Sequence, residues 1–353
     1  MLKRLRASPW VRAGLLAVVL ACCGYGIHAE WPQMQTALGR LQWYSVAASA
    51  LAAMAGAGCT LLAWREILAD LGSRLPVPAA VRAGFLAQLA KYVPGAVWAF
   101  AAQVELGHDY EVPRRRGATS VAVALAVTVG VGLAVAAAAL PLADGTAAGQ
   151  YLWFLALIPA IAVCLYPPVL ARLVNTALRL IRQEPLEHPL SLRGLGRAIA
   201  WTIAGWLCLG VQVWLVLASL TSYSPKLLLL STGAFALAFS AALLLLVFPG
   251  GIGAREVILI AVLAPVVPRG TALAVAILVR LTTTASDLAW GGVALPIGRT
   301  ARGRALAHTP AHARPRPARG PGGRARAGRV AGAGQPAEPQ VDAGQVPDPL
   351  TPA

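Results

Sequence analysis

Seven apolar runs, each long enough to cross a membrane, dominate this sequence of 353 residues. A helical span needs about 20 apolar residues to match the hydrocarbon core of a bilayer. The chain is 58% hydrophobic and only 12% charged, about half the charge of a soluble domain, so most of it cannot face water. The sequence therefore predicts an all-α, polytopic transmembrane helix bundle of about seven to nine membrane segments. The predicted spans are residues 11–27, 43–63, 117–141, 151–171, 198–221, 227–248 and 271–296.

The positive charges between the runs predict how the chain is oriented. Lys3, Arg4 and Arg6 precede the first run, which we interpret as a retained anchor because another span follows it. The loop at 142–150 contains no Lys or Arg, whereas the loop at 172–197 is rich in arginine. Because cytoplasmic loops carry the excess of basic residues, we expect a multi-pass protein of the cell membrane whose N-terminus and C-terminal tail are both cytoplasmic.

The chain divides into two parts of different composition. Residues 1–298 hold every apolar run and form the predicted transmembrane domain, whereas residues 299–353 are rich in Arg, Pro, Gly and Ala. A segment with so few large apolar side chains cannot bury a core, so we expect this tail to be disordered. The net charge of +16 is typical of nucleic-acid binders, but attraction to an anionic leaflet explains the tail arginines, and no specific nucleic-acid partner is expected.

The distribution of reactive side chains argues against several other functions. All five cysteines lie within apolar runs without a CxxC spacing, so neither disulfides nor a zinc site are expected. No motif for ATP binding occurs, and Glu30 and Asp144 are the only acidic residues in the outside loops. We therefore expect no cofactor, no metal and no enzymatic activity. A membrane glycosyltransferase or lipid phosphatase is the less favoured alternative.

Two apolar stretches, 83–104 and 249–268, do not fit a simple span. Basic residues flank the first one, Arg82 before it and Arg114 after it, so the chain should enter and leave on the same side. We therefore predict a re-entrant hairpin at 83–104. The second stretch opens with a Pro-Gly-Gly break. For it we favour a crossing as a broken helix, because a crossing returns the basic tail to the cytoplasm, with a re-entrant loop as the alternative.

Segment 90–98 places a lysine and a Pro-Gly break within the first of these stretches. Proline removes a backbone donor, and glycine relaxes the backbone beside it, so the groups freed at this depth need protein, water or substrate as partners. Glu105 lies seven positions after Trp98, which places both on one helical face. The alternative is a simple kink whose lysine extends to the head groups. The candidate substrate-binding residues here are Lys91, Pro94, Gly95, Trp98 and Glu105.

A second break lies in the other half of the chain, at 248–256, where a glycine-rich turn leads into an apolar helix. Free backbone amides at a helix start, with an arginine in its first turn, form a favourable environment for an anion. The dinucleotide-binding order GxGxxG is missing. The alternative is a glycine-rich loop at the membrane surface. The candidate binding residues here are Pro249, Gly250, Gly251, Gly253, Arg255 and Glu256.

The last span carries a polar stripe, whose spacing places its members on one helical face. The stripe consists of Arg280, Thr283, Thr284 and Asp287. A charge at membrane depth costs at least a few kcal/mol unless it is paired or hydrated, so the stripe should face the bundle interior. Arg280 and Asp287 are two turns, about 10.5 Å, apart, which favours bridging by threonines, water or ligand over a direct pair. A substrate path and a structural polar network explain the stripe equally well.

The two Pro-Gly breaks fall in corresponding halves of the chain, a pattern that indicates a transporter binding site near the membrane midplane. Here the sequence resembles a known family. The segments LAKYVPGAVW and FPGGIGAREV, together with Glu105 and the polar stripe, are similar to the transmembrane, flippase-like domain of bacterial lysylphosphatidylglycerol synthases over roughly residues 10–298.

This resemblance implies an integral membrane protein of the lipid-translocating type, a stand-alone member of the family. Only a tail follows where the synthases carry an aminoacyl-transferase domain, so lipid lysylation is not expected. The resemblance also implies which residues occupy the characteristic positions: Lys91, Pro94, Gly95, Trp98, Arg255 and Glu256.

The sequence favours a flippase or transporter for an anionic lipid or a lipid-linked, isoprenoid-phosphate intermediate, with Lys91, Arg255 and Arg280 around the phosphate. The alternative is a non-transporting membrane subunit that binds lipid or anchors a partner in a cell-envelope assembly. The expected partners are membrane lipids and proteins of cell-envelope biosynthesis. The hypotheses differ in whether changing Lys91 or Arg255 affects lipid movement or only assembly.

Overall fold

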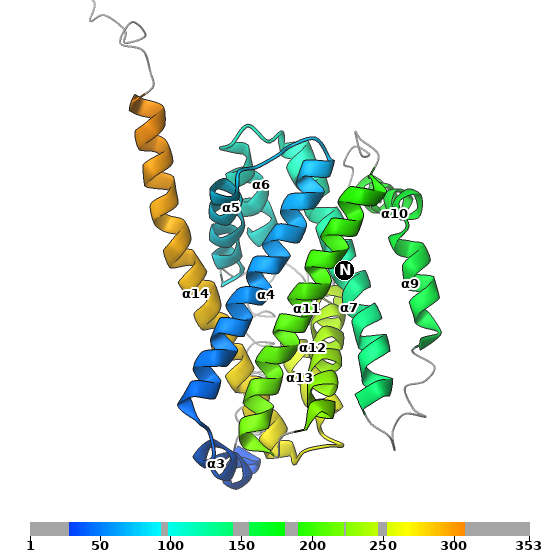
Figure 1. Cartoon of the computed structure of the whole chain (residues 1–353), viewed down its shortest axis with the longest axis vertical. Coiled ribbons are helices and arrows are strands. Elements are labelled where there is room, and N and C mark those ends of the chain that lie inside the picture. The colour runs from blue at the N-terminus through cyan, green and yellow to red at the C-terminus, as the bar shows by residue number, and fades with distance from the viewer. Residues whose placement is uncertain are drawn as a thin grey trace, which may run out of the picture. The chain divides into compact units, whose positions relative to one another are not determined.

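The computed structural model describes residues 28–92, 98–143, 155–180, 190–221, 224–245 and 253–307, and within these ranges it is a bundle of helices without a strand (Figure 1). Five of the described helices are long and apolar enough to cross a membrane. The prediction of an all-α polytopic bundle is therefore confirmed, while the predicted first span, 11–27, lies outside the described residues. The five long helices are α4 (Trp43–Asp70), α7 (Arg114–Ala143), α11 (Leu192–Leu220), α12 (Pro225–Leu245) and α14 (Arg269–Ala307).

The shorter helices lie between and at the ends of these five. α3 (Trp31–Gly39) marks one end of the bundle, and α10 (Pro167–Leu180) marks the other, so we name these the α3 end and the α10 end (Figure 1). At the α10 end, the Asp70 carboxylate accepts a hydrogen bond of 2.7 Å from the backbone N–H of Ser191, which joins the end of α4 to the start of α11. The remaining elements are α5 (Val77–Leu89), the 3-10 turn η1 (Ala90–Tyr92), α6 (Trp98–His108), α9 (Leu157–Leu165) and α13 (Ala254–Leu263).

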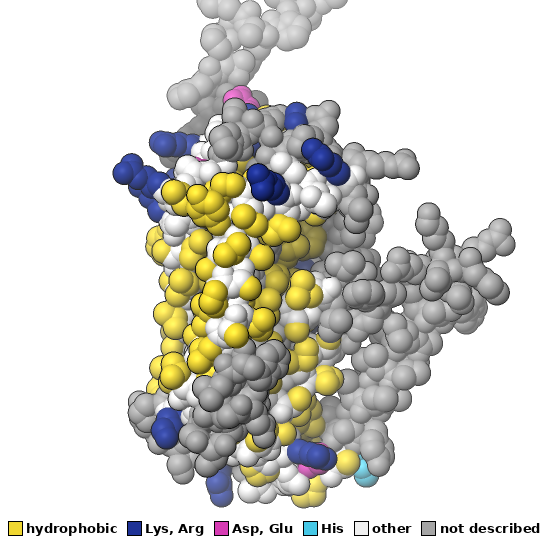
Figure 2. Space-filling view, turned by 90° about the vertical axis from the view of Figure 1, so that its right-hand side faces the viewer, with side chains coloured by type: hydrophobic (Ala, Val, Ile, Leu, Met, Phe, Trp, Pro, Cys, Tyr) yellow, Lys and Arg dark blue, Asp and Glu magenta, His cyan; other side chains and the backbone are white. Residues whose placement is uncertain are grey.

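Small residues let the long helices approach closely. Where α4 crosses α11, a Cβ placed on Gly56 would lie 3.3 Å from the carbonyl oxygen of Gly205, so the two backbones are in contact. Such contacts are typical of helices that associate within a bilayer. On the outside, large apolar side chains such as Leu51 remain exposed, and Figure 2 shows hydrophobic side chains covering the middle of one face between Lys and Arg at its two ends. This surface is the kind that lipid tails cover.

α5 and α6 form the hairpin that the sequence predicts at 83–104. Arg82 near the start of α5 pairs with Asp109 just after α6 at 3.9 Å, so the two ends of the hairpin meet at the same end of the bundle. The Phe85 ring stacks on the Trp290 ring with centroids 4.3 Å apart and an interplanar angle of 6°, which attaches the hairpin to α14. The hairpin tip, including η1, therefore points from the α10 end into the middle of the bundle.

The second irregular stretch, 249–268, returns the chain to the α3 end as the predicted crossing requires, but it is too short for a full span. α13 has 10 residues, about 15 Å, which is half the hydrocarbon thickness. Its start lies against the middle of α12, where Arg255 contacts the Phe235 ring, and its exit leads to Gly270 beside Gln33 of the α3 segment. Pro265 and Pro268 follow α13, and proline does not continue a helix, which explains the early end.

The predicted span 151–171 is a bent pair of helices rather than one straight helix. α9 and α10 meet at an angle of 78°. Tyr166 adopts an extended conformation between them because the residue before proline avoids the helical region, and Pro167 and Pro168 follow it. Residues 151–154 lie outside the described ranges. In α10, Leu170 and Val174 are buried against the bundle.

The last helix ends later than the sequence analysis expects. α14 continues to Ala307, past the predicted domain boundary at residue 298. Residues 299–307 are rich in Arg and Ala, which favour a helix, and contain no proline. The predicted disorder of the tail therefore stays a prediction for residues 308–353, which lie outside the described ranges.

Candidate functional site

Two hairpin-like elements, the α5–α6 hairpin and the pair formed by α12 and α13, converge on the middle of α14. The candidate span within this helix runs from Arg269 to Ile297, so Thr283 is its midpoint and the polar stripe lies at the centre of the span. The η1 tip reaches the stripe from the α10 end, and the start of α13 reaches it from the other direction. Tyr92 and Asp287, which are 195 positions apart in the sequence, thus meet at one place.

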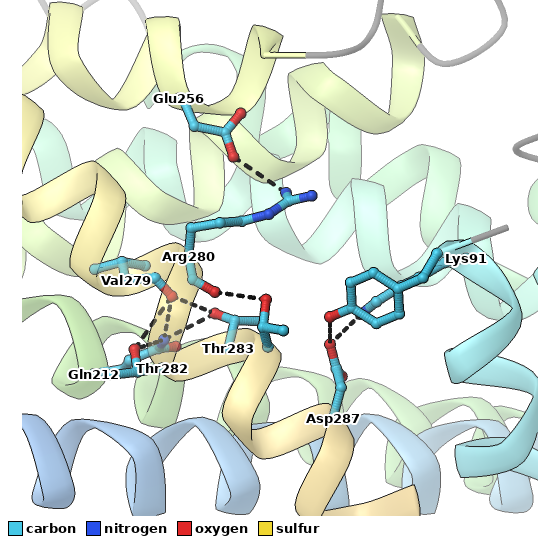
Figure 3. A network of polar contacts seen from close by, with 10 residues as sticks. Lys91, Gln212, Glu256, Val279, Arg280, Thr282, Thr283 and Asp287 are labelled. Atoms are coloured by element: carbon cyan, nitrogen blue, oxygen red, sulfur yellow. Dashed lines mark hydrogen bonds and ion pairs between the residues drawn. The ribbon is translucent and has the colours of Figure 1, made fainter. Parts of the chain in front are cut away.

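Asp287 is held by two consecutive residues of the η1 tip. The Lys91 ammonium lies 2.6 Å from the Asp287 carboxylate, and the Tyr92 hydroxyl donates a hydrogen bond of 2.7 Å to the same oxygen (Figure 3). The Asp287 side chain is only 4% exposed, whereas the Lys91 side chain is 36% exposed. The carboxylate is therefore buried within the bundle while its cationic partner stays accessible.

The second ion pair lies two turns along α14 from the first. The Arg280 guanidinium is 3.1 Å from the carboxylate of Glu256 in the first turn of α13 (Figure 3). Gly253, which caps α13, has a φ of +86°, a left-handed conformation that glycine adopts without strain. The Arg280 side chain is 56% exposed, so this pair also has an open side.

Arg255 directly precedes Glu256 in the first turn of α13, so the two side chains do not stack on one face of the helix. Its guanidinium lies 4.8 Å from the centre of the Phe235 ring and 5.7 Å from that of Phe239, both on α12. Arg255 interacts electrostatically with Glu256, Arg280 and Asp287, and Lys91 likewise interacts with Arg255. Five charged side chains therefore form one charge cluster, consisting of Lys91, Arg255, Glu256, Arg280 and Asp287.

A neutral network flanks the charge cluster on the inner side of α14. The amide nitrogen of Gln212, a fully buried residue of α11, lies 3.1 Å from the Val279 carbonyl and 2.9 Å from the hydroxyls of Thr282 and Thr283 (Figure 3). The Ser49 hydroxyl of α4 donates to the Gln212 backbone carbonyl at 3.1 Å. This network joins α4, α11 and α14, so Thr283 belongs to a structural contact as well as to the predicted stripe.

The structure brings six of the predicted residues together and places another, Glu105, away from them. The Glu105 side chain is 62% exposed and pairs with Arg114 at 2.7 Å, and this guanidinium holds the pKa of the Glu105 carboxyl below its usual range. Two helical turns place Glu105 about 10.5 Å beyond Trp98 toward the α10 end, away from the charge cluster. The residues that the structure brings together are Lys91, Arg255, Glu256, Arg280, Thr283 and Asp287.

The remaining predicted residues lie at or within the two breaks of the chain. Trp98 begins α6, but its side chain lies outside the description. Gly253 lies at the start of α13. The others fall in the two breaks, outside the described ranges: Pro94, Gly95, Pro249, Gly250 and Gly251.

The sequence analysis missed four residues that shape the site. Tyr92 shares Asp287 with Lys91, and its position beside the lysine was the available signal. Gln212 is the only amide in a long apolar run, a signal that points to an interior contact. Phe235 and Phe239 resemble any other core aromatics in the sequence, so only the fold reveals their contact with Arg255.

Within the described residues, no group of three or more His, Cys, Asp or Glu side chains could hold a metal ion. The charge cluster and its neighbours supply cations, carboxylates and hydroxyls, which can bind and orient an ion or a head group.

Comparison with known proteins adds one finding to this geometry. A search of the curated proteins gave no significant match. A family model described as the lysylphosphatidylglycerol synthase TM region matches residues 10–291, which include both hairpin-like elements and the whole charge cluster. Because the match covers well over half of the chain, this multi-pass membrane protein belongs to the lysylphosphatidylglycerol synthase transmembrane-region family.

Proposed function

We propose that this protein is a flippase or transporter that moves an anionic lipid, or a lipid-linked isoprenoid phosphate, across the membrane. The observation that carries the proposal is the meeting of two hairpin-like elements at the charge cluster, in the middle of an otherwise apolar span. Broken elements that meet near the midplane are typical of transporter substrate sites. The protein's role in this proposal is to bind and move a lipid, not to catalyse a reaction.

The exposure of the cations supports this function over a purely structural role. A structural ion pair within a membrane is expected to be buried on both sides, because exposed charge at this depth is costly. Here the carboxylate of Asp287 is buried, while Lys91 and Arg280 keep 36% and 56% of their side chains exposed. Exposed cations at mid-span are stabilised when water or an anionic head group reaches them, which is the condition that a lipid path creates.

The distribution of basic residues supports a cytoplasmic α10 end in the cell membrane. Because basic residues accumulate on the cytoplasmic side, the richer end faces the cytoplasm. Arg40, Lys226 and Arg269 lie toward the α3 end. The larger basic set belongs to the α10 end, around the ends of α4, α6 and α10 and the starts of α5, α7 and α11: Arg65, Arg82, Arg114, Arg116, Arg172, Arg179, Arg193 and Arg197.

A lipid-movement assay tests the proposal. The full chain is reconstituted into liposomes that contain a fluorescent anionic phospholipid, and a membrane-impermeant reductant added outside reports how much label becomes accessible. We expect the wild type to accelerate exposure, and Lys91→Ala and Arg255→Ala to slow it. Lys226→Ala, a lysine change at the α3 end, serves as the matched control.

The same variants separate the proposal from its alternative, a lipid-binding or anchoring subunit of a cell-envelope assembly. If neither the wild type nor any variant moves lipid, while Lys91→Ala and Arg255→Ala weaken the co-purification of a protein partner, the anchoring function is supported instead. Normal lipid movement in both site variants contradicts the proposed site.

A further inference from the structure

The charge cluster contains one more positive than negative side chain. Lys91 pairs with Asp287, and Arg280 pairs with Glu256. Arg255 is the remaining charge. It lies against the Phe235 and Phe239 rings, and the two carboxylates that it also senses electrostatically, Glu256 and Asp287, already pair with Arg280 and Lys91. The cluster therefore has a formal charge of +1, which resides on Arg255.

This count does not depend on where protons lie within the pairs. If a proton moves from Lys91 to Asp287, both groups become neutral and the sum of that pair remains zero. The Arg280–Glu256 pair is likewise zero as an ion pair. Arginine stays protonated in proteins, so Arg255 keeps its charge. The excess of one positive charge is thus a property of the residue set.

The surroundings of Arg255 make this excess charge consequential. Phe235 and Phe239 stabilise the guanidinium through their ring faces, but they supply no full negative charge. Electrostatic interactions in a poorly hydrated interior are stronger than in water, and an uncompensated charge there is costly. One bound negative charge neutralises the cluster, whereas a second one would have no cation left to pair with.

We propose that Arg255 makes this site selective for lipids whose head group carries a single negative charge, such as a phosphodiester. Asp287 and Glu256 act as resident counter-charges that disfavour head groups with two negative charges, such as a terminal phosphate monoester or a pyrophosphate. The inference rests on the proposed function, since it concerns the same site, and it names the charge class of the lipid.

A matched lipid series tests the charge rule directly. Three short-chain lipids with identical acyl chains differ in head-group charge: phosphatidylcholine is net neutral, phosphatidylglycerol carries one negative charge, and phosphatidic acid carries close to two above neutral pH. Binding of each to the full chain in detergent is measured as the concentration-dependent rise in the thermal unfolding midpoint. For the wild type we expect phosphatidylglycerol to bind about tenfold more tightly than either of the other two.

Variants change the charge of the cluster one unit at a time. Arg255→Gln reduces it to zero and should remove the preference for phosphatidylglycerol over phosphatidylcholine. Asp287→Asn and Glu256→Gln each raise it to +2 from different helices, and both should shift the preference toward phosphatidic acid by about tenfold. Asp109→Asn, an exposed acid at the base of the hairpin, changes the total charge equally and should leave the ranking as in the wild type.

The use of two acidic positions protects the test against a variant that fails to fold. A wild type that prefers phosphatidic acid, an Arg255→Gln variant that keeps the preference for phosphatidylglycerol, or acidic variants with the wild-type ranking would each overturn the charge rule. In these three cases lipid still binds, so the proposed function stands. If none of the three lipids stabilises the protein, the proposed function and the charge rule both fail.

Discussion

Removing Lys91 from the Lys91–Asp287 pair should destabilise the protein far more than removing Asp287. Lys91→Ala leaves the 4%-exposed Asp287 carboxylate without its cation. Removing one partner of a buried ion pair costs about 3–5 kcal/mol, because an uncompensated charge stays in the interior. The Tyr92 hydroxyl still donates to Asp287, so we expect a loss of about 3 kcal/mol. Asp287→Ala leaves Lys91 and Tyr92, both accessible, and should cost about 1 kcal/mol.

Thermal unfolding of the detergent-solubilised chain measures this asymmetry, since 1 kcal/mol corresponds to about 2–4 °C in a chain of this size. The double variant, Lys91→Ala with Asp287→Ala, should be more stable than Lys91→Ala alone because it contains no buried carboxylate that lacks a cationic partner. A Lys91→Ala variant as stable as Asp287→Ala, or a double variant less stable than Lys91→Ala, would refute this reasoning.

Three further substitutions test the packing around the site, each by thermal unfolding. Gly210→Val should cost about 3 kcal/mol, because a Cβ there would lie 2.8 Å from the backbone of Thr232, whereas Gly196→Val in the same helix meets open space and should change stability little. Gln212→Leu removes the hydrogen bonds between α11 and α14 and should cost about 1–2 kcal/mol; an unchanged midpoint would show that the network is dispensable. Trp290→Leu should cost about 3 kcal/mol and also weaken lipid binding through Lys91, because Trp290 stacks on the hairpin and donates to α4; intact lipid binding contradicts this coupling.

The hairpin at 83–104 could be predicted because the stretch is apolar enough to cross the membrane but carries basic residues on both flanks. Arg82 and Arg114 required both ends on one side, and the structure places Arg82 beside Asp109. The same reasoning gave the direction of 249–268 but not its length, because hydropathy does not distinguish a ten-residue helix from the end of a longer span. The bend at Tyr166 was readable from Pro167 and Pro168, yet the continuous hydropathy of 151–171 concealed it.

The separation of Glu105 from the charge cluster has a simple physical origin. Two residues that are seven positions apart on a helix share a face, but they are also separated by two turns along the axis. That distance moves Glu105 from the tip of the hairpin to its base, where Arg114 is the nearer partner. Sequence spacing specifies which face of a helix a residue occupies. It does not say which partner lies beside that residue at its depth in the membrane.

The sequence by itself determined the membrane class, the long helices and the positions of the two breaks, because each depends on local properties such as apolar length and the chemistry of proline and glycine. It also placed Arg280 and Asp287 on one stripe, since helical geometry is local. Only the tertiary structure decided that Lys91 holds Asp287, that Glu256 holds Arg280, and that Arg255 lies against two aromatic rings. These pairings join helices that are distant in the chain, and the packing of α5, α12, α13 and α14 selects one partner among several of equal charge.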